Sequence, residues 1–307
     1  MGEASDHERL QAAQRHIEVL RGELDRLGEL LRDFDPPPGE IPEVPWIDVY
    51  GEALPRNGQA GGDHLIYVDF KKRYRMERLI AEAPEGLREK LRATSGRAGI
   101  AVIDVEGHDY GSAFIAAVFH QAFLLGVHYE LRTAGEVTTA LFENINTRFF
   151  NSSGIHKTLT LVYGEITESG TFRFLSAAHP LPVVFSNAFA RLVAISGDRL
   201  ANFPQIGTMP SPGHSEKAVP LLGVKEKYTV NEISLMGRGD ILVLYSDGLS
   251  DHRDDQGRPY FPERLEQVLR ANKQLPAREI FRRLIEDMRA FRADFDDDVA
   301  AVIIKKT

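Results

Sequence analysis

The chain contains no cysteine among its 307 residues. This absence excludes disulfide bonds, zinc sites built from thiolates, and every mechanism that uses a cysteine nucleophile. A metal ion bound by this protein would therefore have oxygen or imidazole ligands.

The chain also lacks a basic cluster interleaved with aromatic residues, and its formal net charge is −8. We therefore expect neither nucleic acid nor an anionic membrane surface as a partner. No uninterrupted apolar run approaches the roughly 18 residues that cross a bilayer. Residues 1–30 are charged throughout, unlike a signal peptide. These features predict a cytoplasmic protein.

A heptad-like apolar pattern is present in the N-terminal part of the chain. Its members recur in alternating steps of three and four: Leu10, Ala13, Ile17, Leu20, Leu24, Leu27, Leu31 and Phe34. This spacing is typical of the a/d seam of a coiled coil. An amphipathic helix packed on its own domain is the alternative, but the densely charged flanking positions favour pairing between two copies. We predict a coiled-coil helix at residues 1–34 that forms a homodimer.

A proline-rich segment, residues 35–45, follows this helix with the sequence DPPPGEIPEVP. Proline cannot continue a helix and biases the preceding residue away from the helical region. We expect this segment to be a linker and residues 46–307 to form one large domain. The composition of the chain, 43% hydrophobic and 27% charged, allows a sizeable core.

Apolar alternation with a period of two predicts several strands in the large domain. The clearest pair, residues 158–166 and 171–176, is joined by a Glu-Ser-Gly turn that is typical of a hairpin. Residues 73–92 predict one surface helix. The helix after Asp104 is apolar on nearly every side, which predicts burial between layers. Hairpin-linked strands with helices segregated before and after them favour an α+β fold with antiparallel sheets.

Four aspartates stand at the ends of predicted apolar strands: Asp63, Asp104, Asp247 and Asp297. Each alone has a simpler explanation, because aspartate is common in turns, where its side chain bonds the nearby backbone. Four that abut core strands are harder to explain in this way. Converging carboxylates raise one another's pKa unless a cation compensates, and oxygen ligands suit Mg²⁺ or Mn²⁺. The pattern favours a site for such ions.

These aspartates lie in the segments GGDHLIYVDF, AVIDVEGHDYGSAF, ILVLYSDGLSD and DDDVAAVII. In this order and spacing the segments resemble motifs of the protein phosphatase 2C superfamily. The likeness is to the bacterial branch related to stage II sporulation protein E and the sigma-factor regulator phosphatases. It covers residues 44–306, and four ordered motifs are more specific than any one of them.

The resemblance implies a β-sandwich of two antiparallel sheets flanked by helices, preceded by the coiled-coil helix. It implies hydrolysis of phosphoserine or phosphothreonine by two Mn²⁺ or Mg²⁺ ions that activate a bridging hydroxide for in-line attack. By position in the motifs, the implied metal ligands are Asp63, Asp104 (bridging both ions), the Val105 carbonyl, Asp247 and Asp297. Asp298 follows as their neighbour and as a candidate ligand of a third ion.

His108 is a candidate general acid, because a seryl leaving group benefits from protonation and histidine titrates in the useful pH range. The alternative is that this histidine only hydrogen-bonds the turn before the next helix. Three positions depart from the family pattern: Asp109 and Ala178 replace usual glycines, and Ala300 replaces a usual threonine. None removes a ligand, but Asp109 puts the tight entry into the next helix in question, and the three together would suit a slower enzyme.

Two hypotheses about function follow. The first is a cytoplasmic serine/threonine phosphoprotein phosphatase in bacterial signalling of the partner-switching type. Its substrate, implied by the resemblance alone, is a phosphorylated anti-sigma-factor antagonist. The second is a catalytically weak or silent module that uses the same fold to bind a protein partner. The presence of all four aspartates speaks against the second hypothesis.

Overall fold

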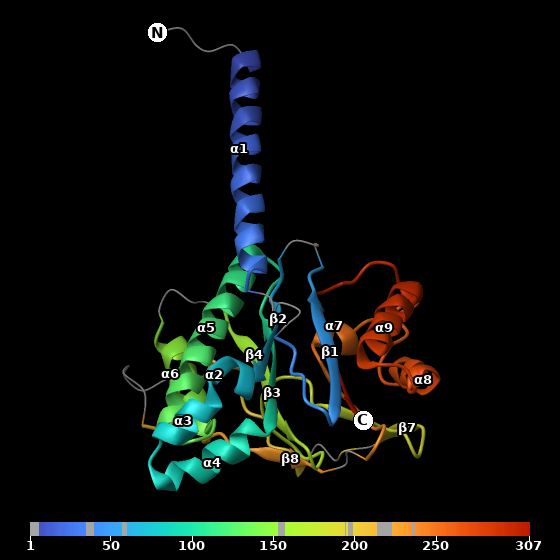
Figure 1. Cartoon of the computed structure of the whole chain (residues 1–307). Coiled ribbons are helices and arrows are strands. Elements are labelled where there is room, and N and C mark those ends of the chain that lie inside the picture. The colour runs from blue at the N-terminus through green and yellow to red at the C-terminus, as the bar shows by residue number, and fades with distance from the viewer. Residues whose placement is uncertain are drawn as a thin grey trace.

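The computed structural model describes residues 6–34, 40–56, 60–152, 157–193, 195, 199–213, 223–234 and 237–307. In this part of the chain, two five-stranded sheets pack face to face and helices cover both outer faces (Figure 1). The N-terminal helix extends away from this body as a stalk (Figure 1). The predicted β-sandwich flanked by helices is confirmed.

The first sheet has the strand order β1–β10–β9–β6–β7 and the second β2–β3–β4–β5–β8. The strands of the first sheet are β1 (Ile47–Leu54), β6 (Val183–Ser186), β7 (Arg191–Val193), β9 (Ile241–Tyr245) and β10 (Val299–Lys306). Those of the second are β2 (Asp63–Asp69), β3 (Arg97–Val105), β4 (Leu159–Thr167), β5 (Phe172–Ala177) and β8 (Asn231–Ile233). All neighbouring strands are antiparallel.

The central strands are continuous apolar runs because both of their faces are covered. Every residue of β9 is buried. Leu242 and Leu244 lie in the core between the two sheets, whereas Val243 and Tyr245 point to the helices outside. This alternation is the period of two expected of a strand, and burial of both faces removes the polar residues that an exposed face would carry.

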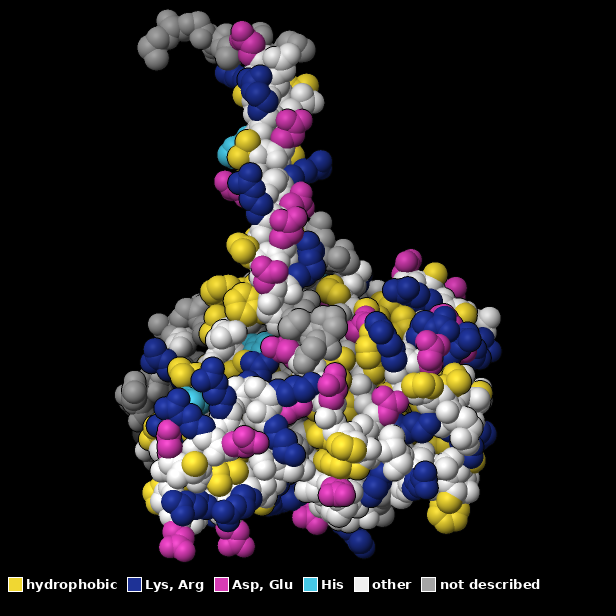
Figure 2. Space-filling model, in the orientation of Figure 1, with side chains coloured by type: hydrophobic (Ala, Val, Ile, Leu, Met, Phe, Trp, Pro, Cys, Tyr) yellow, Lys and Arg dark blue, Asp and Glu magenta, His cyan; other side chains and the backbone are white. Residues whose placement is uncertain are grey.

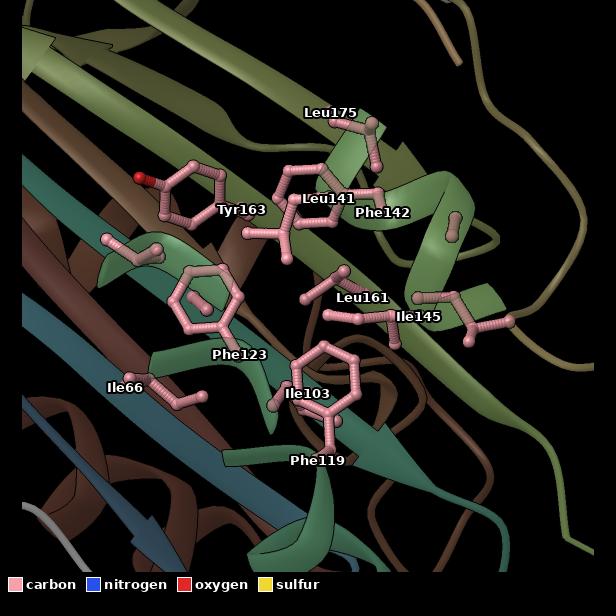
Figure 3. Close-up of a cluster of buried hydrophobic side chains, with 14 of the residues drawn as sticks. Ile66, Ile103, Phe119, Phe123, Leu141, Phe142, Ile145, Leu161, Tyr163 and Leu175 are labelled. Carbon is pink, nitrogen blue, oxygen red and sulfur yellow. The ribbon is translucent and has the colours of Figure 1, made fainter. Parts of the chain in front are cut away.

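Two long helices, α5 (Tyr110–Thr133) and α6 (Thr139–Asn151), cover the second sheet. Figure 3 shows Phe119 and Phe123 of α5 packed with Phe142 of α6 and Tyr163 of β4. On the other side, α8 (Glu263–Asn272) and α9 (Ala277–Phe291) cover the first sheet. Helix α9 buries one face at helical spacing and carries arginines on the other, as an amphipathic surface helix does.

The prediction that the helix after Asp104 is buried between layers was wrong, because only one side of it is covered. Helix α5 has one outward stripe, on which Phe114, Leu125 and Tyr129 are 56%, 72% and 65% exposed. By length and composition alone it could cross a bilayer, but half of its apolar window is buried inside the protein. Its other face packs on the second sheet, which is the position of a core helix.

The single helix predicted over residues 73–92 is divided into three. They are α2 (Phe70–Tyr74), α3 (Met76–Glu82) and α4 (Glu85–Ser95). Arg75 adopts a left-handed conformation with φ 47° between the first two, and Pro84 precedes the third. The break at Pro84 follows from sterics, because a residue before proline is driven out of the helical region and Ala83 is extended here.

Helix α1 (Asp6–Arg32) carries the predicted heptad pattern. Its last turn packs within the same chain, because Leu31 and Phe34 contact Ala113 and Ala117 of α5. The end of the predicted seam is thus intramolecular, which was the alternative considered from the sequence. The earlier seam positions are solvent-exposed, for example Ile17 at 49%. Figure 2 shows apolar side chains scattered along the stalk between charged ones.

Residues 40–46 pack on the domain. Ile41, Val44 and Trp46 contact the core between the sheets. Lys72 and Arg73 pair with Glu43 and Glu40 at 2.7 and 2.6 Å. The preceding part of the predicted linker, residues 35–39, lies outside the described residues.

Candidate metal centre

Two of the predicted ligands face each other across neighbouring strands of the second sheet. Asp63 is the first residue of β2, and it pairs directly with Asp104 near the end of β3. Directly paired residues of an antiparallel ladder project from the same face of the sheet, with their Cβ atoms about 5 Å apart. The strand register therefore brings these two carboxylates together, with Asp63 buried and Asp104 half-buried.

The other aspartates come from the first sheet. Asp247 opens the short helix α7 (Asp247–Ser250), two residues after the last residue of β9. Asp297 and Asp298 directly precede β10, which pairs with β9. Because the end of β9 and the start of β10 are adjacent, the three carboxylates leave the first sheet at the same end. The sandwich thus brings acids from both sheets to one end of the molecule.

The pKa values of these carboxyl groups are raised by burial and by one another's negative charge. Burial, and then the negative charges of Asp247, Asp297 and Asp298, raise the pKa of Asp104 to about 7. Burial also raises the pKa of Asp63 well above its usual value, and the charges of Asp104, Asp298 and Asp247 add to this effect. Burial is again the first cause of the raised pKa of Asp247, followed by Asp297. Burial and the negative charges of neighbouring acids therefore both disfavour the ionised forms of Asp63, Asp104 and Asp247.

The donor set fits a divalent cation. Among the described residues, no lysine or arginine forms an ion pair with these aspartates. The same residues contain no group of three or more acids and histidines placed so that it could hold a metal ion as it stands, so the fit rests on the chemistry of the donors. A doubly charged cation relieves the repulsion between neighbouring carboxylates. Mg²⁺ and Mn²⁺ prefer oxygen donors such as carboxylates and a backbone carbonyl. The side chains that would hold such ions are the predicted ones: Asp63, Asp104, Asp247 and Asp297.

Asp298 acts as an anchor in this structure. Its two oxygens accept hydrogen bonds from the backbone N–H groups of Arg56 and Gly62, both at 2.7 Å. These bonds lower its pKa, against the larger effect of burial that raises it. Asp298 therefore holds Arg56 and Gly62, the latter directly before Asp63, against the start of β10.

Close approach of the backbone explains the paired glycines before Asp63. A Cβ on Gly61 would lie 2.3 Å from the Asp298 carboxylate, and one on Gly62 would lie 2.1 Å from the Val105 carbonyl oxygen. The Val105 N–H in turn donates to the Gly62 carbonyl at 3.2 Å. The carbonyl implied as a ligand is thus fixed against the loop that carries the first acid.

The loop between β3 and α5 is held by an ion pair that the sequence did not reveal. The Lys157 ammonium donates to Asp109 Oδ1 at 2.9 Å, to Ser112 Oγ at 2.6 Å and to the Glu106 carbonyl at 3.1 Å. Asp109 also caps α5, because its Oδ1 accepts from the Ser112 N–H at 2.8 Å. The departure at Asp109 therefore leaves helix entry intact.

His108 lies on the same loop and is exposed. Burial raises the pKa of the Asp298 carboxyl, and an electrostatic interaction with His108 is the weakest of the influences that oppose this rise. The structure thus places the candidate general acid within electrostatic range of Asp298.

Ser246 is the contact that sequence reasoning missed. It is the residue between the end of β9 and Asp247 in the chain, and it is fully buried. Its hydroxyl donates to Asp63 Oδ2 at 2.6 Å. The signal was present in the motif ILVLYSDGLSD, since a serine beside a predicted ligand has a hydroxyl within reach of the site.

Two antiparallel sheets packed in this way, with acids gathered at one end, define the class of proteins with the protein phosphatase 2C fold. Residues 94–307 match the family model described as stage II sporulation protein E, and the chain belongs to this family. No curated protein matches the chain.

Many solved structures match this chain, and three of them illustrate the shared fold. The SiaA-PP2C domain of Pseudomonas aeruginosa has a TM-score of 0.63 at 14% identity, covering 96% of this chain and 99% of its own. The RsbU and RsbW domains of Rv1364c from Mycobacterium tuberculosis have a TM-score of 0.57 at 19% sequence identity, and the match covers 87% of this chain and 61% of that chain. The PP2C phosphatase domain of SpoIIE from Bacillus subtilis was solved with a fragment of its regulatory domain. It has a TM-score of 0.56 at 15% sequence identity, and the match covers 84% of this chain and 63% of that chain. This chain thus spans less than two thirds of the Rv1364c and SpoIIE chains.

Proposed function

We propose that this chain is a divalent-metal-dependent serine/threonine phosphoprotein phosphatase that acts in the cytoplasm. The observation that carries the proposal is the meeting of Asp63, Asp104, Asp247 and Asp297 at one end of the sandwich. Membership of the stage II sporulation protein E family supports it.

Each acid has a role that follows from its place. Bound Mn²⁺ or Mg²⁺ ions would supply the positive charge that activates water and neutralises the phosphoryl oxygens. Asp104, whose pKa is raised first by burial and then by three other acids, would be the ligand shared by both ions, as its place in the family motif implies. Asp63 and Asp247 hold the two sides of the site, one from each sheet, and Asp297 lies at its exposed rim.

His108 is the residue we assign to hold a proton for the leaving seryl oxygen. It is exposed on the loop that follows Asp104. An aryl phosphate needs no such proton, so His108→Ala should slow hydrolysis of a phosphoserine protein more than that of nitrophenyl phosphate. Equal effects on both substrates would leave His108 with the role of a turn residue.

The proposed substrate is a phosphorylated antagonist of an anti-sigma factor. The support is the likeness to a chain in which an RsbU domain is joined to an RsbW domain. The direct test of activity is release of phosphate from a phosphoserine protein with millimolar Mn²⁺ and with a chelator. Turnover that requires Mn²⁺ supports the proposal, whereas a protein that binds the substrate without turnover under both conditions would be a binding module.

We also propose that the chain forms a homodimer through α1. Leu10, Leu20 and Leu24 are 58%, 44% and 45% exposed on a helix that extends from the domain, and a/d side chains supply most of the association of a coiled coil. The double substitution Leu20→Asp and Leu24→Asp should give monomers in sedimentation. A matched change outside the seam, Arg21→Asp with Asp25→Arg, should not. A wild-type monomer, or a dimer that survives the seam substitutions, would contradict this assignment.

A further inference from the structure

Ser246 joins the two sheets at the end where the acids meet. It follows the last residue of β9, in the first sheet, and has no solvent exposure. Its Oγ lies 2.6 Å from Asp63 Oδ2, in the second sheet, and 2.9 Å from the backbone nitrogen of Ala300. Its own N–H donates to the Ala300 carbonyl at 3.0 Å. Three strands are thus linked through one small side chain.

The direction of these hydrogen bonds is fixed by their chemistry. The Ala300 N–H can only donate, so Ser246 Oγ accepts there. A hydroxyl has one proton, which is therefore directed at Asp63 Oδ2. Oδ2 of Asp63 is held as an acceptor, while Oδ1 accepts no hydrogen bond from the described residues.

The same contact couples two acids that belong to different sheets. Ser246 immediately precedes Asp247, and Asp63 pairs directly with Asp104. A rotation of the Asp63 carboxylate would break its bond to Ser246, and a shift of Ser246 would move Asp247. Hydrogen bonds that orient a ligand in this way typically contribute about 10- to 100-fold to metal affinity.

We propose that Ser246 is a positioning residue, which fixes the Asp63 carboxylate so that its free oxygen is presented to a divalent cation shared with Asp104 and Asp247. This inference rests on the proposed function, because it assumes that the acidic cluster binds metal. It concerns the hydroxyl alone and assigns Ser246 no contact with the ion or the substrate.

The test is calorimetric titration of the metal-free full chain with Mn²⁺. We expect Ser246→Ala to weaken binding about 10- to 100-fold. Ser186→Ala is the matched control, because Ser186 is also buried but lies at the far end of the first sheet, beyond the residue that pairs with Ile241. The control should bind as wild type does. A wild-type chain that does not bind Mn²⁺ would overturn the proposed function itself, whereas wild-type affinity in a folded Ser246→Ala protein would overturn only the role of Ser246.

Two further variants separate positioning from a general effect on the fold. Ser246→Thr keeps the hydroxyl, so its affinity should lie within about threefold of wild type, and a folded Thr variant as weak as the Ala variant would contradict the proposal. In an Asp63→Asn background, Ser246→Ala should add little further loss, because the two residues act through one contact. A full additional loss in that background would show that Ser246 does not act through Asp63.

Discussion

Gly62 lies so close to Val105 that a Cβ atom on it would be 2.1 Å from the Val105 carbonyl oxygen. We predict that Gly62→Ala destabilises the protein by about 2 kcal/mol, as overpacking against backbone does, and that it weakens Mn²⁺ binding by moving this carbonyl. The control is Gly86→Ala in α4, where a Cβ meets nothing within 4 Å. That change should be neutral or stabilising by up to about 1 kcal/mol. Urea unfolding of both variants checks the pair, and equal stabilities would contradict the account.

Ala178 adopts a left-handed backbone conformation, with φ 52°. This position has a usual glycine in the family pattern, and an L-residue there carries a strain of about 1–2 kcal/mol. Ala178→Gly relieves that strain but loosens the unfolded chain, which offsets about half of the gain. We predict a net stabilisation of about 0.5–1 kcal/mol, measured as a higher midpoint of urea unfolding. A lower midpoint would mean that the strain is absent.

Asp109 contributes through charge and through its cap. Hydrogen bonds from Lys157 and the Ser112 N–H lower its pKa to about 2. Because the folded pKa lies below the unfolded one, the stabilisation is present above pH 4 or so and is lost as the pH falls towards 2. Asp109→Ala should cost about 1 kcal/mol at pH 7, and Asp109→Asn, which keeps a capping oxygen, should cost less. Unfolding free energies at pH 7 and pH 3 test this order. If the unfolding free energy of wild type exceeded that of Asp109→Asn by more at pH 3 than at pH 7, this prediction would be contradicted.

Lys225 and Glu143 form a buried ion pair at 2.7 Å that fixes the segment after residue 223 to α6. The lysine side chain has no exposure, and the same carboxylate accepts the Tyr228 N–H at 2.7 Å. Removing one partner leaves a buried charge, so Lys225→Met should cost about 3 kcal/mol. The exposed pair Lys90–Glu136 is the control, and Lys90→Met should cost less than about 0.5 kcal/mol. Thermal unfolding compares the two variants, and similar losses of stability would contradict the prediction that the buried ion pair contributes more than the exposed one.

Strand periodicity predicted antiparallel sheets in an α+β domain, because hydrophobic alternation and turn residues are local signals, and the β-sandwich was implied by the family resemblance. The aspartates could be located for the same reason, since each stands where an apolar run begins or stops. Their meeting depends on the register that pairs Asp63 with Asp104, and register is set by the whole sheet. The sequence pattern alone could not supply it.

The parts that sequence reasoning missed depend on contacts between distant residues. Lys157 reaches Asp109 across 48 positions, and Ser246 reaches Asp63 across 183. The burial of Leu31 against α5 was likewise invisible in a heptad pattern, because that pattern is the same whether its partner is another chain or its own domain. The break at Pro84 was a local signal that could have been used.

The most direct test of the central claim is the steady-state rate on a phosphoserine protein for wild type, Asp104→Asn and Asp255→Asn, each with Mn²⁺ and with a chelator. Asparagine is nearly isosteric, so the fold should persist while the carboxylate that we propose to be shared by the ions is lost. We predict Mn²⁺-dependent turnover in wild type and in the Asp255→Asn control, whose side chain is 93% exposed. Asp104→Asn should lower kcat at least about 100-fold, as expected when a transition-state interaction is removed. The same low, Mn²⁺-independent rate in wild type and Asp104→Asn would contradict the phosphatase account.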